Sequence, residues 1–288
     1  MRADDVPDIF ITSQILDGEL AKNRLADLSG YPFVNDLSTS ILDQVSIDGG
    51  IYLLPAGNSM YGIYYNKTLM EEHHWEVPSD FAELESLCGE IREAGLIPGV
   101  VGTQLTGGLF STVFNLAKTD WLTTAEGRWE ETMEYVGRYI DIGMFHTDPE
   151  DRNNPQIFLD WLGNRRAVFC TMVQTVNITE LPETGDKLGM MPFISRDGSK
   201  NIYMYSPAFY FGISSRLTEP GNEEKLENAI KIMSLLCSPA GQAAFSSESA
   251  PCVISALNSA NPPEDSLIYD AAGAMKEGRA FQMTYAGW

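Results

Sequence analysis

Acidic side chains are the most abundant groups that could do chemistry in this chain of 288 residues, which holds 40 Asp and Glu but only 3 His. A glycoside hydrolase needs one carboxyl pair about 5 to 9 Å apart across a cleft. The acids considered for such a pair lie in or beside expected helices, where solvated carboxylates are ordinary: Asp120, Asp141, Asp148 and Asp160. The sequence therefore favours no catalytic residue, and a glycan-active enzyme stays open only as an alternative.

The other reactive side chains also lack the spacing that chemistry requires. His73, His74 and His146 are too few and too badly spaced for a metal site or for a base beside a nucleophile. The cysteines contain no C-x-x-C pair: Cys88, Cys170, Cys237 and Cys252. We expect buried free thiols, with a disulfide between Cys237 and Cys252 as the open alternative. No phosphate-binding glycine loop occurs, so we expect neither a metal nor a cofactor.

Charge and hydropathy narrow the class of partner. A net charge of −21 disfavours nucleic acid and anionic membranes, and the longest basic cluster is the pair Arg165 and Arg166. No apolar run reaches the ~18 residues that a membrane span needs, and residues 1–4 do not form a signal peptide. The length suits one large domain or two ordinary ones. We expect a monomer whose partner is neutral or cationic.

Residues 48–70 combine turn, strand and polar signals in the order DGGIYLLPAGNSMYGIYYNKTLM. A β-rich run over 51–54 is stopped by Pro55, and a small polar loop follows. A second β-rich run over 60–65 leads into helix formers, with Asn66 as the expected N-cap. The pattern predicts a strand, a loop, a second strand and a helix.

The residues of this stretch resemble family 1 extracellular solute-binding proteins, which are the sugar receptors of ABC importers. The matching positions are Asp48, Gly49, Tyr52, Pro55, Tyr65, Asn66 and Lys67. In that family the loop between the two runs crosses between lobes and lines the ligand cleft. The resemblance therefore implies that Asn58, Ser59 and Tyr61 bind ligand, although Asn58 could merely turn and Tyr61 merely pack.

Further segments resemble the same family in the correct order along the chain. They imply additional ligand-binding residues at Ser13, Gln14, Gln104, Thr106, Gln174, Phe209 and Tyr285. Helix capping by Ser13 and sheet packing by Phe209 are the alternatives. Thr175 stands where relatives carry a tryptophan that stacks on the sugar. The ligands of relatives are therefore not assumed for this chain.

The resemblance implies an α/β protein with a two-lobe periplasmic-binding-protein-like fold of class II, whose first lobe lacks its initial strands. Residues 1–58 and 208–262 would form the first lobe, and residues 59–207 and 263–288 the second. A segment over 223–245, with a Ser-Pro break and Gly-Gln after it, matches a scaffold helix pair of the family. We expect a chain truncated at its N-terminus and at its C-terminus.

The implied function is that of the substrate-binding component of an ABC importer. It would bind a sugar or oligosaccharide between the lobes by hinge closure, without catalysis, and would deliver it to the permease subunits. In a longer precursor it would be an extracellular lipoprotein anchored to the membrane. The alternative is a degenerate remnant of such a receptor without a transport function.

Overall fold

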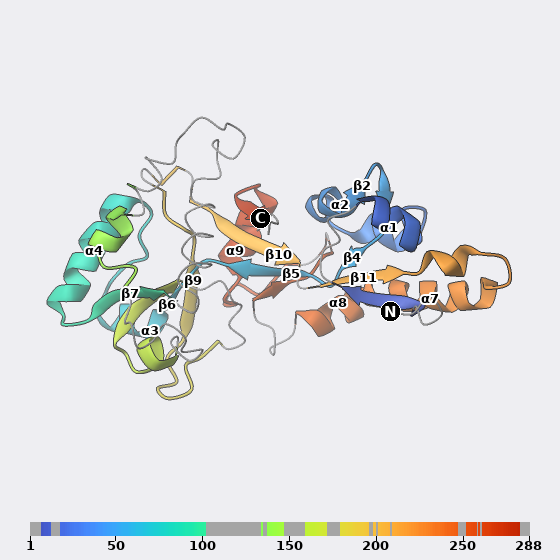
Figure 1. Ribbon diagram of the computed structural model, residues 1–288. Helices are drawn as coiled ribbons and strands as arrows, with labels where there is room; N and C mark the ends of the chain where they lie inside the picture. Colours follow the sequence, from blue (N-terminus) through green and yellow to red (C-terminus); the bar gives the residue numbers. More distant parts are fainter. Residues whose placement is uncertain are drawn as a thin grey trace. The chain divides into compact units, whose positions relative to one another are not determined.

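The computed structural model of this chain forms two compact units (Figure 1). It describes residues 7–12, 18–101, 134, 137–146, 159–171, 179–195, 198–199, 201–207, 209–246, 252–257, 259 and 261–282. Unit 1 comprises residues 1–59 and 207–262, and unit 2 comprises residues 60–206 and 263–288. The chain therefore passes from one unit to the other three times.

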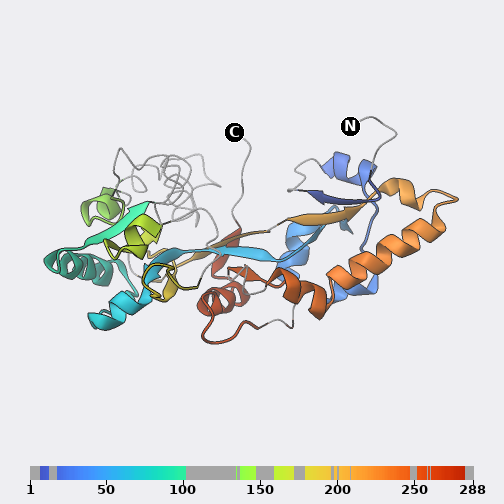
Figure 2. The ribbon, with the colours of Figure 1, turned by 90° about the horizontal axis from the view of Figure 1, so that it is seen from below.

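Unit 1 is built on a small antiparallel sheet in which β11 (Tyr210–Ile213) lies between β1 (Ile9–Thr12) and β4 (Leu54–Pro55). Its remaining elements are α1 (Gly18–Arg24), η1 (Pro32–Asp36), α2 (Thr39–Val45), β2 (Ser46–Ile47), β3 (Gly50–Ile51), η4 (Ser215–Thr218), α7 (Glu223–Leu236), α8 (Pro239–Phe245) and β12 (Val253–Ile254). Figure 2 shows α7 leading into α8, both in orange. Ser238 caps α8 at the Ser-Pro break that the sequence predicted. The sequence predicts a first helix that ends near Leu28, but α1 ends at Arg24, because Leu25 bridges Ser214.

Unit 2 contains a mixed sheet of order β7-β8-β6-β9. The strands are β6 (Ile63–Asn66), β7 (Ile97–Val101), β8 (Ala167–Thr171) and β9 (Leu188–Met191). Strand β7 runs parallel to β8, and β6 runs antiparallel to both of its neighbours. The helical elements among its described residues are α3 (Lys67–Glu72), α4 (Phe81–Glu93), the π-helix η3 (Leu159–Gly163) and α9 (Tyr269–Lys276).

In the sequence, Phe81, Leu84, Cys88 and Ile91 recur at helical spacing and predict one buried helix face. The structure confirms it, since all four side chains of α4 are buried in the core of unit 2.

Helical spacing in the sequence also predicts a buried stripe of Trp129, Met133, Val136 and Ile140, and this prediction is wrong at Ile140. The other three positions lie outside the described residues. Ile140 is 51% exposed, and its neighbour Tyr139 fills the core instead. The hydroxyl of Tyr139 donates to the carbonyl of Ile194 at 2.8 Å, which fixes the ring inward.

The stretch over 48–70 forms more strands than the sequence predicted. Pro55 is not outside a strand but ends β4, where it pairs with Tyr210. The expected polar loop is instead strand β5 (Asn58–Tyr61), because β12 pairs with it. Gly62 lies between β5 and β6. Only glycine fits there, because a Cβ would lie 2.5 Å from the carbonyl oxygen of Met191.

Strand β5 belongs to a second sheet of four strands, in the order β12-β5-β10-β13, with β10 (Tyr203–Pro207) and β13 (Ala280–Gln282). Strands β10 and β13 are parallel. The boundaries between the units fall within β5, after Ser59, and within β10, after Ser206. Regular strands thus carry two of the three passages of the chain.

All four cysteines are free and buried, which confirms the expected thiols and excludes the bridge between Cys237 and Cys252 in this structure. Burial raises the pKa of the Cys88 and Cys237 thiols to about 12. Both side chains therefore act as small apolar core residues rather than as nucleophiles.

Candidate functional site

Strand β5 places a carboxamide where the described protein gives it no partner. Asn58 pairs through its backbone with Ile254 of β12, and its side chain is 0% exposed. Neither Oδ1 nor Nδ2 of Asn58 has a hydrogen-bond partner within the described part of the chain. A buried polar group without a partner costs about 1–3 kcal/mol. The side chain can supply one acceptor and two donated protons to a bound molecule.

A glycine next to Asn58 allows this arrangement. Gly57 has φ +120°, which favours glycine, and a Cβ there would lie 2.8 Å from the carbonyl oxygen of Ile254. The missing side chain lets the backbone of β12 approach β5 closely. Ser59, the next sequence-predicted ligand residue, is also buried and pairs with Val253. The Gly57-Asn58-Ser59 segment is therefore fixed by β12 rather than being a free turn.

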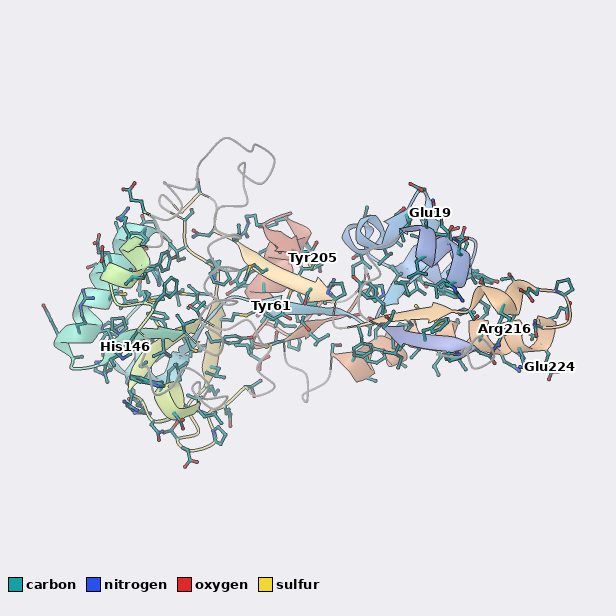
Figure 3. All side chains as sticks on the ribbon, viewed as in Figure 1. Glu19, Tyr61, His146, Tyr205, Arg216 and Glu224 are labelled. Carbon is teal, nitrogen blue, oxygen red and sulfur yellow. The ribbon has the colours of Figure 1, made fainter. Side chains whose placement is uncertain are left out.

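Tyr61, at the end of β5, packs into the core of unit 2 with Ile63 and Met204. Its hydroxyl lies 3.0 Å from Oγ of Ser206 on β10, and the two groups share a buried hydrogen bond. Figure 3 labels Tyr61 and, on β10, Tyr205, whose phenol pKa is raised by burial. The ring of Tyr61 thus takes the packing role that the sequence left open, and its polar end is already satisfied.

Phe209 lies in an aromatic cluster of unit 1. Its ring centroid is 5.4 Å from Phe211 and 5.6 Å from Phe245, and both contacts are edge-on. Its carbonyl accepts a hydrogen bond of 2.9 Å from the amide of Ala56. Phe209 is half-buried and takes part in packing, as the alternative interpretation expected.

Strands β7 and β8 of the unit 2 sheet end side by side at the same edge. Val101, the last residue of β7, pairs with Thr171, the last residue of β8, and Ile63 at the start of β6 pairs with Thr171 from the other side. The carboxyl ends of parallel strands are the usual place for ligands in α/β sheets. The remaining sequence-predicted ligand residues lie outside the described residues: Ser13, Gln14, Gln104, Thr106, Gln174 and Tyr285.

Thr171 is a residue that the sequence reasoning missed. It is 2% exposed, and its Oγ1 has no hydrogen-bond partner within the described ranges. The available signal was a single hydroxyl at the end of the otherwise apolar strand AVFCT.

The opposite edge of the same sheet carries a fully paired polar network. Asn66 caps α3 by accepting the amide of Leu69 at 2.8 Å, which confirms the predicted cap, and its Nδ2 donates to Asp186 at 2.7 Å. Arg165 donates to both oxygens of Asp186, at 2.7 and 2.6 Å, and to both oxygens of Glu72, at 2.9 and 3.1 Å. These bonds from Arg165, joined by that from Asn66, hold the pKa of Asp186 below its usual range.

The buried polar groups of the described chain are almost all uncharged. Among the residues that the structure describes, Asp186 is the charged side chain in the buried set, and its partner Arg165 neutralises it. The other buried polar residues of the described chain are uncharged: Asn58, Ser59, Asn66, Thr171, Ser206, Ser214 and Gln242. Buried uncharged donors and acceptors are suited to hydrogen bonds with a neutral polar molecule.

Two further observations bear on other classes of protein. Within the described ranges, His, Cys, Asp and Glu side chains form no group of three or more that could hold a metal ion. None of the described helices combines the length and the apolar character that crossing a membrane requires.

Comparison with known proteins assigns the chain to a family. Residues 1–276 match the sequence model of the bacterial extracellular solute-binding proteins. No curated protein matches the chain by sequence.

Among solved structures, the apo form of RafE from Streptococcus pneumoniae is similar with a TM-score of 0.71 at 18% identity, over 98% of this chain and 75% of that chain. A sugar transporter from Bacillus licheniformis, solved with stachyose, gives 0.62 at 16% identity over 99% and 78%. Maltose-bound MalE3 from T. maritima gives 0.66 at 20% identity over 96% and 74%. The α/β fold expected from the sequence is thus confirmed, and the chain belongs to the bacterial extracellular solute-binding proteins, with their two-lobe architecture.

Proposed function

We propose that this protein is the substrate-binding component of an ABC importer and that it binds a sugar or oligosaccharide. The observation that carries the proposal is the buried carboxamide of Asn58, whose two heteroatoms lack partners in the described chain. A sugar hydroxyl both donates and accepts, so it can satisfy Oδ1 or Nδ2 equally well. Membership of the solute-binding family makes a bound solute the natural source of that partner.

The similar structures favour a carbohydrate over other solutes. They include proteins solved with raffinose, stachyose and maltose, and one described as binding chitin oligosaccharide. The uncharged character of the described buried polar groups agrees with a neutral polyhydroxyl ligand. No bond has to be broken for such a function, which agrees with a family of binding proteins rather than enzymes.

The proposal extends to the working of the whole protein. The lobes expected from the sequence, 1–58 with 208–262 and 59–207 with 263–288, would close on the ligand by hinge motion, with β5 and β10 as two of the connecting segments. The protein would act as a monomer, anchored outside the cell as a lipoprotein, and would hand its ligand to permease subunits. Ser59, Phe209 and the ring of Tyr61 would line the site around Asn58, together with the predicted residues outside the described ranges. The hydroxyl of Tyr61 would stay bonded to Ser206.

A thermal-shift screen followed by calorimetry tests the proposal. The panel contains raffinose, stachyose, maltose, galactose and a chitin oligosaccharide, with a peptide and a polyamine as non-sugar solutes. We expect at least one sugar to raise the Tm, because a ligand at 100 times its Kd stabilises the folded state by about 2.7 kcal/mol. A shift with the peptide or the polyamine and none with any sugar would show that the sugar assignment is wrong.

A further inference from the structure

We infer that the hydroxyl of Thr171 is a further ligand-binding group, which forms a hydrogen bond with a hydroxyl of the bound sugar. The inference rests on the proposed function and adds a residue on unit 2 to it. Thr171 is 2% exposed, and no partner for its Oγ1 occurs among the described residues. The described part of the fold therefore does not explain the presence of this hydroxyl.

The register of the sheet places this hydroxyl between two apolar side chains. Thr171 pairs with Val101 on one side and with Ile63 on the other, so the three side chains share one face of the sheet. Both neighbours are buried. A valine would fill the same volume and would avoid the desolvation of a hydroxyl. Packing alone thus does not explain a threonine at this position.

The position of Thr171 along its strand points to a ligand. It is the last residue of β8, and it lies level with the last residue of the parallel strand β7. This is the edge of an α/β sheet at which ligands usually bind. The hydroxyl is covered in this structure, so the proposed contact requires a ligand-bound conformation in which Thr171 is uncovered.

A second threonine of unit 2 provides a matched comparison. Thr68 lies at the opposite edge, on α3, where its Oγ1 accepts a hydrogen bond of 2.9 Å from the amide of Lys187. Replacing either threonine by valine makes the same chemical change. At Thr68 the change removes a bond within the protein, whereas at Thr171 it removes a group that the described protein does not use.

The test measures Tm and sugar affinity for wild type, Thr171→Val, Thr171→Ser and Thr68→Val, with raffinose, stachyose, maltose, galactose and a chitin oligosaccharide as probes. Thr171→Val should keep or raise the Tm of the free protein and weaken the affinity for the bound sugar about tenfold, since the sugar loses a buried partner. Thr171→Ser keeps the hydroxyl and should bind within about twofold of wild type. Thr68→Val should lower the Tm and leave the affinity unchanged.

The outcomes separate the inference from the function on which it rests. Wild-type affinity in Thr171→Val would overturn the inference and leave the proposed function standing. Absence of binding to every sugar by the wild type would overturn both. If Thr171→Val does not fold, Thr171→Ser and Thr171→Ala carry the test, because they differ by the hydroxyl alone. Equal affinity of that pair would again overturn the inference.

Discussion

Two asparagines of one short stretch, Asn58 on β5 and Asn66 at the end of β6, are both fully buried, yet the protein treats them in opposite ways. Asn66 accepts from the amide of Leu69 and donates to Asp186. Asn58 has no side-chain hydrogen bond to any described residue. A buried carboxamide that is paired inside the protein stabilises the fold, whereas one left unpaired costs stability unless a bound molecule completes it.

The same contrast recurs elsewhere in the described chain. Gln242 of α8 is 1% exposed, and it accepts from the amide of Ala256 at 2.7 Å while donating to the carbonyl of Leu236 at 3.0 Å. Thr171 is 2% exposed, and its hydroxyl has no hydrogen bond to any described residue. Substitutions at paired groups should therefore lower stability, and substitutions at unpaired groups should lower ligand affinity.

The largest effect is expected at the centre of the paired network. Asp186→Ala leaves Arg165 with Glu72 alone and removes the acceptor of Asn66. We expect a loss of about 2–3 kcal/mol in the free energy of unfolding in urea, below the range for a fully buried pair because Arg165 remains partly exposed. Glu72→Ala is the control, since it removes an exposed partner and should cost about 1 kcal/mol or less.

The carboxylate of Asp186 should also make the stability of the protein depend on pH in the acidic range. The pKa of Asp186 is lower in the folded protein, chiefly through the bonds from Arg165, than its ordinary value of 3.8. Its contribution to stability is therefore complete above that ordinary value and is lost as the pH falls through the lower folded pKa. Between pH 5 and 2, the free energy of unfolding in urea should decrease less steeply with falling pH for Asp186→Asn than for wild type. An unchanged slope would show that the pairing adds nothing in solution.

Asn66→Leu should come next, with a loss of about 2 kcal/mol. The change removes the N-cap of α3, worth about 1 kcal/mol, and one bond to buried Asp186. Equilibrium unfolding measures the loss, and sugar affinity should stay at the wild-type value because the network lies at the edge of the sheet opposite Thr171. A stability equal to that of wild type would contradict the structural role of Asn66.

The extent of sequence prediction follows the same division. The cap by Asn66, the buried face of α4 and the break before α8 were predictable because they depend on neighbours along the chain. The pairing of Asn66 with Asp186 and Arg165 was not, since those residues lie 120 and 99 positions away and no local pattern joins them.

The candidate site shows the same limit. Family resemblance selected Asn58, but its burial results from the pairing of β5 with β12, some 195 residues later. The sequence showed small polar residues there and predicted a loop. Thr171 escaped notice because a threonine in a strand is common and its lack of a partner appears only in three dimensions.

Asn58→Leu is the counterpart of Asn66→Leu and should reverse its outcome. The leucine has a similar volume and removes an unpaired buried group, so the free protein should be as stable as wild type or up to about 1 kcal/mol more stable. Affinity for the best sugar of the panel should fall at least tenfold, equivalent to about 1.4 kcal/mol, as measured by calorimetry. A loss of stability matching that of Asn66→Leu, with binding intact, would remove the distinction between the two asparagines.

The smallest effect is expected at Tyr61, where a sequence-predicted ligand residue proved to be paired. Tyr61→Phe keeps the buried ring and removes the hydroxyl that shares a hydrogen bond with Ser206. The free energy of unfolding should therefore fall by about 1 kcal/mol, and the affinity for sugar should change by less than about twofold. Alanine is unsuitable, because deleting a buried ring costs several times more through cavity formation. If Tyr61→Phe instead weakened sugar binding as strongly as Asn58→Leu, then a hydroxyl that is paired in the free protein would exchange Ser206 for the ligand. Pairing in the free structure would in that case no longer separate groups that hold the fold from groups that bind.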